Sequence, residues 1–159
     1  MLKNYLVPLI ILFFSPRLVL SQFSEKIVFN SKDSANDYYL AVRPLSGNIQ
    51  GVQVLLTSFN PPEFILAESK LQNIAYGNDL LTIIASLNQS FCADSSSVDR
   101  MNQILQHVVN HFSADTSKFA LGGFMYAGNI TLRYTELCYE NPSRFPILPK
   151  AVFAINCPV

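Results

Sequence analysis

The sequence predicts an α/β fold, a three-layer α/β/α sandwich built around a mostly parallel sheet. Two observations indicate this class. Several short segments are continuously apolar, which is typical of parallel strands that are covered on both faces. Helical patterns separate the later strands, and this alternation favours a doubly wound sheet. The apolar segments predict strands over residues 52–57, 80–85, 119–124 and 151–155.

Two further strands are expected before these, at residues 26–29 and 38–43. Residues 31–36 between them are rich in Ser, Asp and Asn, which favour turns because their side chains bond to nearby backbone. Pro44 ends the second strand. We therefore expect the two strands to pair as an antiparallel hairpin.

Helices are expected between the later strands. A long one is predicted over 96–112, with Ser96 and Asp99 as its capping residues. A second helix is expected over 126–139, and a weaker one after Pro62. The apolar positions of the long helix recur every three or four residues and form one face: Val98, Met101, Ile104, Leu105, Val108, Val109 and Phe112.

Composition limits the classes of function. The chain has 159 residues, half of them apolar, which suits one domain with a packed core. Eleven basic residues balance eleven acidic ones, so no electrostatic argument favours nucleic acid or an anionic membrane surface. The three cysteines, Cys92, Cys138 and Cys157, form no CxxC pair, and we expect no structural metal site.

The N-terminal residues 1–21 resemble an export signal. A short basic start precedes an apolar stretch that is too short to span a membrane, and a cleavage site is plausible after Ser21. We expect a periplasmic or extracellular protein whose mature domain covers 22–159 and which does not remain membrane-bound. An uncleaved amphipathic anchor is the alternative, and Arg17 within the stretch is the residue that fits a signal least well.

The most informative segment is Leu121–Asn129, which joins a predicted strand directly to a predicted helix. A turn this sharp needs small residues two positions before and after its apex, because the strand and helix backbones nearly touch there. Gly123 and Ala127 occupy those positions, and Met125 stands at the apex. The side chain of Met125 is therefore expected to project above the sheet.

The sequence Gly-Gly-Phe-Met-Tyr-Ala-Gly, residues 122–128, resembles the nucleophile elbow of α/β-hydrolases, written Gly-x-Ser-x-Gly. The resemblance extends over residues 26–159, because the strand order agrees and Ser58–Pro61 follows the third strand, as the oxyanion loop does in that family. It implies an α/β-hydrolase fold, incomplete on its C-terminal side, with ester or peptide hydrolysis as the family activity. It also implies no metal and no organic cofactor.

The departures from the family pattern concern the catalytic groups. Met125 stands in place of the nucleophilic serine, and a thioether has no proton to lose and attacks acyl carbon poorly. No histidine follows Met125, and the only later acids, Glu136 and Glu140, lie on the predicted helix after the turn. The sequence therefore predicts no serine-hydrolase turnover by this chain, as in a fragment or a degenerate hydrolase.

A non-catalytic role is the alternative. The backbone N–H groups of Tyr126 and Phe59 are candidate oxyanion-hole donors, with Gly123, Ala127 and Gly128 as the small residues of the turn. They could bind a small ester or carboxylate ligand, or they could simply face water at the start of a helix. The expected free edge of the last strand favours self-association or pairing with a missing C-terminal half.

Other polar residues receive weaker interpretations. His107 and His111 are four residues apart, as metal ligands can be, but Val108 replaces the glutamate of the His-Glu-x-x-His pattern. We expect both histidines on a solvated surface and no bound metal. Ser58, Ser86 and Cys157 are near strand ends but have no evident base, so turn formation is the preferred interpretation.

Overall fold

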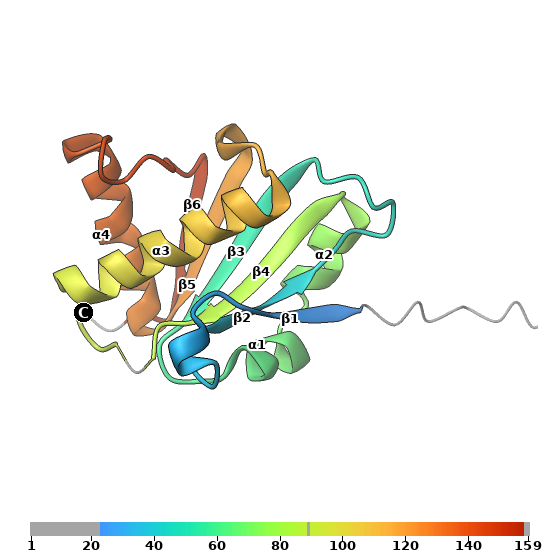
Figure 1. Ribbon diagram of the computed structural model, residues 1–159, viewed down its shortest axis with the longest axis horizontal. Coiled ribbons are helices and arrows are strands. Elements are labelled where there is room, and N and C mark those ends of the chain that lie inside the picture. Colours follow the sequence, from blue (N-terminus) through green and yellow to red (C-terminus); the bar gives the residue numbers. More distant parts are fainter. Residues whose placement is uncertain (1–22, 89, 158–159) are drawn as a thin grey trace, which may run out of the picture.

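The computed structural model describes residues 23–88 and 90–157, and the predicted export signal lies outside the described residues. A six-stranded sheet with the order β1-β2-β4-β3-β5-β6 runs through the molecule (Figure 1). Its strands are β1 (Ser24–Val28), β2 (Tyr38–Val42), β3 (Gly51–Thr57), β4 (Leu80–Ser86), β5 (Phe119–Phe124) and β6 (Ala151–Ile155).

The sheet is antiparallel at one end and parallel through the rest. β1 pairs antiparallel with β2, which confirms the predicted hairpin, and β2 pairs antiparallel with β4. β3 lies between β4 and β5 and is parallel to both, and β6 continues the parallel part beside β5. The carboxyl ends of four strands therefore lie at one edge of the sheet, where ligand sites of α/β folds are found.

Helices cover both faces, as predicted. One face carries α3 (Ser95–Phe112) and α4 (Tyr126–Glu140), and its core contains Val54, Met101 and Tyr134. The opposite face carries α1 (Pro62–Glu68) and α2 (Leu71–Gly77). A smaller core lies there, made of Tyr38, Leu40, Leu55, Ile65 and Ile84. Two 3₁₀ turns, Ser31–Asp33 and Thr116–Lys118, complete the described elements.

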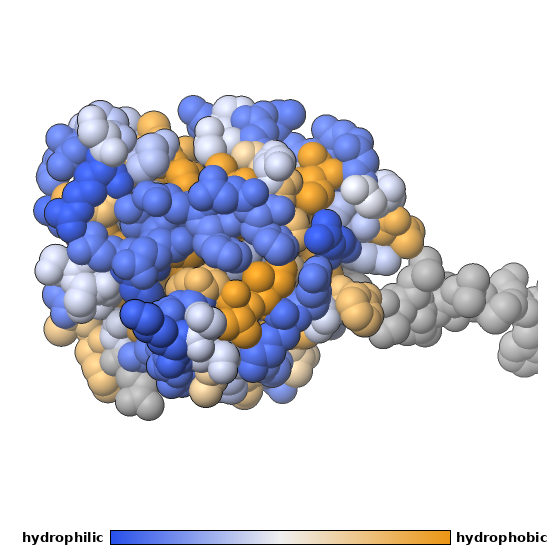
Figure 2. All heavy atoms as spheres, in the orientation of Figure 1, coloured by the Kyte–Doolittle hydropathy of each residue, from blue (hydrophilic) through white to orange (hydrophobic). Residues whose placement is uncertain are grey.

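The long helix α3 is amphipathic. Its inward residues belong to the main core, and its outward residues form a hydrophilic band across the face shown in Figure 2. Among the described residues, no helix is both long and apolar enough to cross a membrane. The band is the solvated side of an ordinary surface helix.

One local prediction differs from the structure, and one helix was not predicted. The N-cap of α3 is Asp94 rather than Ser96, because the Asp94 carboxylate accepts the backbone N–H of Ser97 at 2.8 Å. That hydrogen bond also lowers the pKa of Asp94. α2 was not predicted, because a helix of seven residues carries little periodicity.

The strand β6 ends the sheet, and no described strand pairs with its outer edge. Ala151, Ala154 and Ile155 are exposed there, Ile155 to 41% of its surface. β6 carries no charged residue, which is unusual for an edge strand, because charges on edges normally prevent unwanted pairing.

Candidate functional site at the turn between β5 and α4

Met125 stands alone between β5 and α4, as the sequence predicts. Its backbone has φ 55° and ψ −130°. Only a few per cent of non-glycine residues have a positive φ, and such a conformation persists where the surrounding structure enforces it. The Met125 side chain is 38% exposed, so the turn presents it toward solvent instead of burying it in the core.

Gly123, Ala127 and Gly128 make the turn possible. A Cβ atom on Gly123 would lie 2.5 Å from the backbone carbonyl carbon of Ala127. A Cβ atom on Gly128 would overlap the Cys157 Sγ, and Ala127 is fully buried. The strand and the helix are thus in direct backbone contact, as expected from the sequence, and larger side chains would push them apart.

Backbone hydrogen bonds hold the apex against its neighbours. The Met125 N–H donates to the carbonyl oxygen of Ile155 on β6 at 2.8 Å, and the Gly128 N–H donates to the Met125 carbonyl at 3.0 Å. Both groups are therefore occupied by the protein itself. The N–H groups of Tyr126 and Ala127 belong to the first helical turn, where the helix itself supplies no acceptor.

An aromatic cluster of Phe59, Phe91 and Tyr126 lies beside the apex. The Phe59 ring is 5.5 Å from that of Tyr126, and the Phe91 ring is 4.7 Å from Phe59 and 5.7 Å from Tyr126. All three contacts are edge-to-face, a favoured arrangement of aromatic rings. The structure thus brings together the two residues predicted as oxyanion-hole donors. Phe91 was not predicted, because it lies in a loop with no periodic pattern.

A pocket of about 370 Å³ adjoins this cluster through Phe59. It lies at the carboxyl edge of the parallel strands, between the turn before β2, the loop after β3 and the end of β4. Small-molecule sites usually occupy about 300–1,000 Å³, so this pocket is large enough for a small ligand. Its lining carries no charge and consists of Ala35, Asn36, Tyr38, Phe59, Pro61, Pro62, Ser86 and Asn88.

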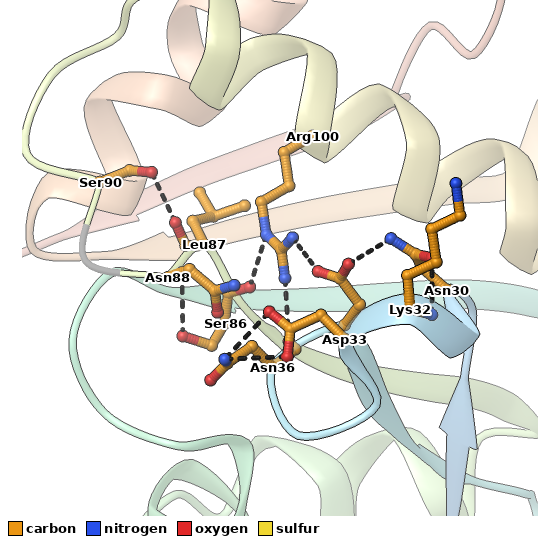
Figure 3. A network of polar contacts seen from close by, with 10 residues as sticks. Asn30, Lys32, Asp33, Asn36, Ser86, Leu87, Asn88, Ser90 and Arg100 are labelled. Carbon is orange, nitrogen blue, oxygen red and sulfur yellow. Dashed lines mark hydrogen bonds and ion pairs between the residues drawn. The ribbon is translucent and has the colours of Figure 1, made fainter.

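Arg100 contacts two residues of the pocket lining, Asn36 and Ser86 (Figure 3). Its guanidinium donates to the backbone carbonyls of Asn36 at 3.0 Å and Ser86 at 3.4 Å, and it forms an ion pair with Asp37. The Arg100 and Asp37 side chains are only 17% and 11% exposed, and Asn30 donates a further hydrogen bond to Asp37 at 2.6 Å. Sequence patterns gave no indication of this pair, because its members are 63 residues apart.

No described hydrogen bond brings a histidine or a later acid to the turn. Glu136 and Glu140 both pair with Arg133 on α4, at 2.9 and 3.3 Å. His107 lies on α3, where its Nδ1 is 2.9 Å from the Tyr39 hydroxyl. A base and an acid aligned with Met125 are therefore not found among the described contacts.

The expectation that both histidines lie on a solvated surface is wrong for His107. It is half-buried against the rings of Phe29 and Tyr39 and stacks on His111, which is exposed. Burial, with a smaller contribution from His111, lowers the pKa of His107. The helical pattern does not predict this burial, because it depends on Phe29 and Tyr39 of the β1–β2 hairpin, which pack against the side of α3 that was expected to be solvated.

The remaining candidate groups are placed as follows. Ser58 is 1% exposed and its hydroxyl has no hydrogen-bond partner among the described residues, so it is sealed from any substrate. The Ser86 hydroxyl accepts the Asn88 N–H at 3.2 Å, as a turn former does. Within residues 23–88 and 90–157, no three His, Cys, Asp or Glu side chains are grouped as metal ligands.

Comparison with known proteins finds likeness only in structure. No protein-family model matches the chain, and no curated protein matches its sequence. An acetyl xylan esterase from Aspergillus awamori superposes with a TM-score of 0.59 at 13% identity, over 82% of this chain and 50% of that enzyme. The esterase Est22, solved with p-nitrophenol, gives 0.59 at 16% identity, over 83% and 43%.

A third neighbour, Thermogutta terrifontis esterase 2 phosphonylated by sarin, gives a TM-score of 0.58 at 14% identity, over 84% of this chain and 54% of that one. The neighbours are esterases of the α/β-hydrolase type, and the chain spans about half of their length. The chain therefore has an α/β-hydrolase type of fold, and its six-stranded sheet is compatible with an incomplete version of it.

Proposed function

We propose that this chain is an α/β-hydrolase-like protein that does not hydrolyse esters by serine chemistry. The observation that carries the proposal is Met125 at the apex of the turn, with the strained backbone of a nucleophile elbow but no hydroxyl. Acyl transfer in this fold requires a nucleophile that a base can deprotonate. A thioether cannot fill that role, and the longer methionine side chain occupies space where a substrate carbonyl would lie.

The absence of a partner base supports the same proposal. The chain contains two histidines, both on α3, and the side chain of His107 is engaged with Tyr39. Removal of single triad members from serine hydrolases leaves only about 10³–10⁴-fold acceleration over water, supplied by the oxyanion hole and substrate binding. Here nucleophile, base and acid would all have to be supplied from elsewhere.

A binding role is the second candidate, and the pocket beside the aromatic cluster favours it. The first-turn amides of α4 are suited to a carbonyl oxygen, and Phe59 links that region to the pocket. A ligand bound here would be held without being cleaved. The ligand classes expected from the sequence are a small ester and a carboxylate, but the uncharged lining of the pocket favours a different class.

Two further parts of the proposal concern location and association. Export through residues 1–21 follows from their composition alone. The uncharged outer edge of β6 favours pairing in solution, either with a second copy or with the remainder of a longer hydrolase chain. Analytical ultracentrifugation of the mature chain tests the proposed association, and a stable, non-aggregating monomer contradicts it.

Turnover of p-nitrophenyl butyrate tests the catalytic part. We expect the native chain to hydrolyse this ester no faster than the urea-unfolded chain, and Met125→Ala to leave the rate unchanged. The unfolded chain is the matched control, because exposed thiols and imidazoles react slowly with activated esters in any conformation. A native rate that saturates with substrate and falls on substitution of Met125 or Ser58 contradicts the proposal.

A further inference from the structure

We propose that the pocket beside the turn binds an uncharged, hydroxyl-rich ligand of the size of one or two sugar units. The inference rests on the proposed function, because it requires a pocket that binds without hydrolysis.

The hydrogen-bonding groups of the lining are neutral and of both kinds. Asn36 lines the pocket, and its side-chain N–H donates to Asp33 at 3.0 Å, which leaves its side-chain carbonyl oxygen as an acceptor. The Ser86 hydroxyl accepts from Asn88, which leaves its own proton to donate. The Asn88 side chain adds one further donor and acceptor group.

This mixture favours hydroxyl groups over a simple ester. An ester accepts hydrogen bonds but donates none, so the amide oxygens of Asn36 and Asn88 would lose water without gaining a partner. Binding sites built for hydroxyl groups reject ligands that lack them for this reason. A sugar hydroxyl both donates and accepts, and can satisfy either kind of group.

The other half of the lining is flat and apolar. Phe59, Tyr38, Pro61 and Pro62 present ring faces and edges around the same cavity. Sugars carry an apolar face of C–H groups beside their hydroxyls. A pocket with ring surfaces on one side and amides and a hydroxyl on the other matches both sides of such a ligand.

The charges behind the lining disfavour a carboxylate. Glu63 accepts a hydrogen bond from Tyr38 at 2.8 Å, and Asp33 accepts from Asn36. Lys26 Nζ lies 3.6 Å from the centroid of the Tyr38 ring, but Lys26 is not one of the residues that line the pocket. Together with Glu63, burial raises the pKa of Tyr38 to about 12, so its hydroxyl stays neutral.

Arg100 does not supply a free positive charge to the pocket, since it is paired with Asp37. Its contacts with the carbonyls of Asn36 and Ser86 instead fix the two walls that carry the amide and the hydroxyl. We assign Arg100 as a positioning residue of this pocket. A preformed lining binds more tightly than a mobile one, because the ligand does not have to order it.

Saturation-transfer NMR with maltose and cellobiose tests the inference on the mature chain, with butyrate and ethyl acetate as the alternative ligands. We expect saturation transfer to at least one sugar and none to butyrate or ethyl acetate. Asn88→Gly, which suits the positive φ of that residue, and Ser86→Ala should each weaken sugar binding about two- to tenfold, the range of one net hydrogen bond.

Asn110→Ala is the matched control, because Asn110 is an exposed residue on α3 that does not line the pocket, and it should leave sugar binding unchanged. Absence of transfer to both sugars, transfer only to butyrate or ethyl acetate, or sugar binding that survives both pocket variants overturns the inference. These binding results say nothing about ester turnover, which the p-nitrophenyl butyrate assay measures separately. A wrong ligand class can therefore be told apart from a wrong proposed function.

Discussion

Gly123 lies so close to Ala127 that no side chain fits between the end of β5 and the first turn of α4. The Cβ of any other residue at position 123 would be 2.5 Å from the Ala127 carbonyl carbon and 2.5 Å from the Gly128 Cα. Both are backbone atoms, which cannot rotate away as a side chain could. This contact fixes the sharp turn that holds Met125.

Gly123→Ala should therefore destabilise the protein. Overpacking of a tight contact typically costs about 1–3 kcal/mol, and urea unfolding followed by circular dichroism measures it. Gly77→Ala is the control, because nothing lies within 4 Å of the added Cβ at that helical position. That variant should be neutral or more stable, by about 0.4–1 kcal/mol. Equal effects of the two substitutions would mean that the turn is not tightly packed.

Met125→Ser should restore the hydroxyl but not the reaction. The isolated hydroxyl remains protonated at neutral pH, because none of the described contacts brings a base to position 125 and His107, on α3, is bonded to Tyr39 of β2. We expect no burst of p-nitrophenol and no increase over the native chain. A burst that scales with enzyme concentration would show that a base reaches the turn by a route absent from the described contacts.

Arg100→Met should be strongly destabilising, because it leaves the Asp37 carboxylate buried without its partner. Loss of one member of a buried pair typically costs about 3–5 kcal/mol. Arg133→Met, on the exposed surface of α4, is the comparison and should have a much smaller effect, since its carboxylate partners remain solvated. Thermal unfolding measures the stability of both variants. Similar losses of stability in the two would contradict the role given to Arg100.

The free energy of unfolding should depend on pH through His107. Burial lowers its pKa in the folded protein below the ordinary value of 6.5. The unfolded chain therefore binds a proton first as the pH falls, so stability is complete above pH 6.5 and declines below it, toward the lowered folded pKa. Urea unfolding across this range should show the decline, and His107→Gln should reduce it. His111→Gln should raise the pKa of His107, as an NMR titration would report.

The sequence predicted the sheet and the turn well because both rest on strong local signals. β5 and β6 were predicted at their observed bounds, since apolar runs bounded by turn residues leave few alternatives. The small residues at 123 and 127 indicated the sharp turn for a steric reason that the structure bears out. The predicted fold class is confirmed by the layers and by the structural neighbours.

The surroundings of the turn could not be predicted from local patterns. Arg100 and Asp37 meet only because the fold brings α3 against the turn that precedes β2. Phe91 joins Phe59 and Tyr126 from a loop without periodicity. Such contacts depend on tertiary packing between distant segments, which a single sequence does not encode in any short window.

Intact-protein mass spectrometry after treatment with a fluorophosphonate tests the central claim most directly. The reagent phosphonylates activated serines, and the proposal predicts that the folded chain keeps its unmodified mass, because Met125 offers nothing to phosphonylate. A stoichiometric adduct on the native chain that is lost on unfolding would contradict the account, whichever residue carried it.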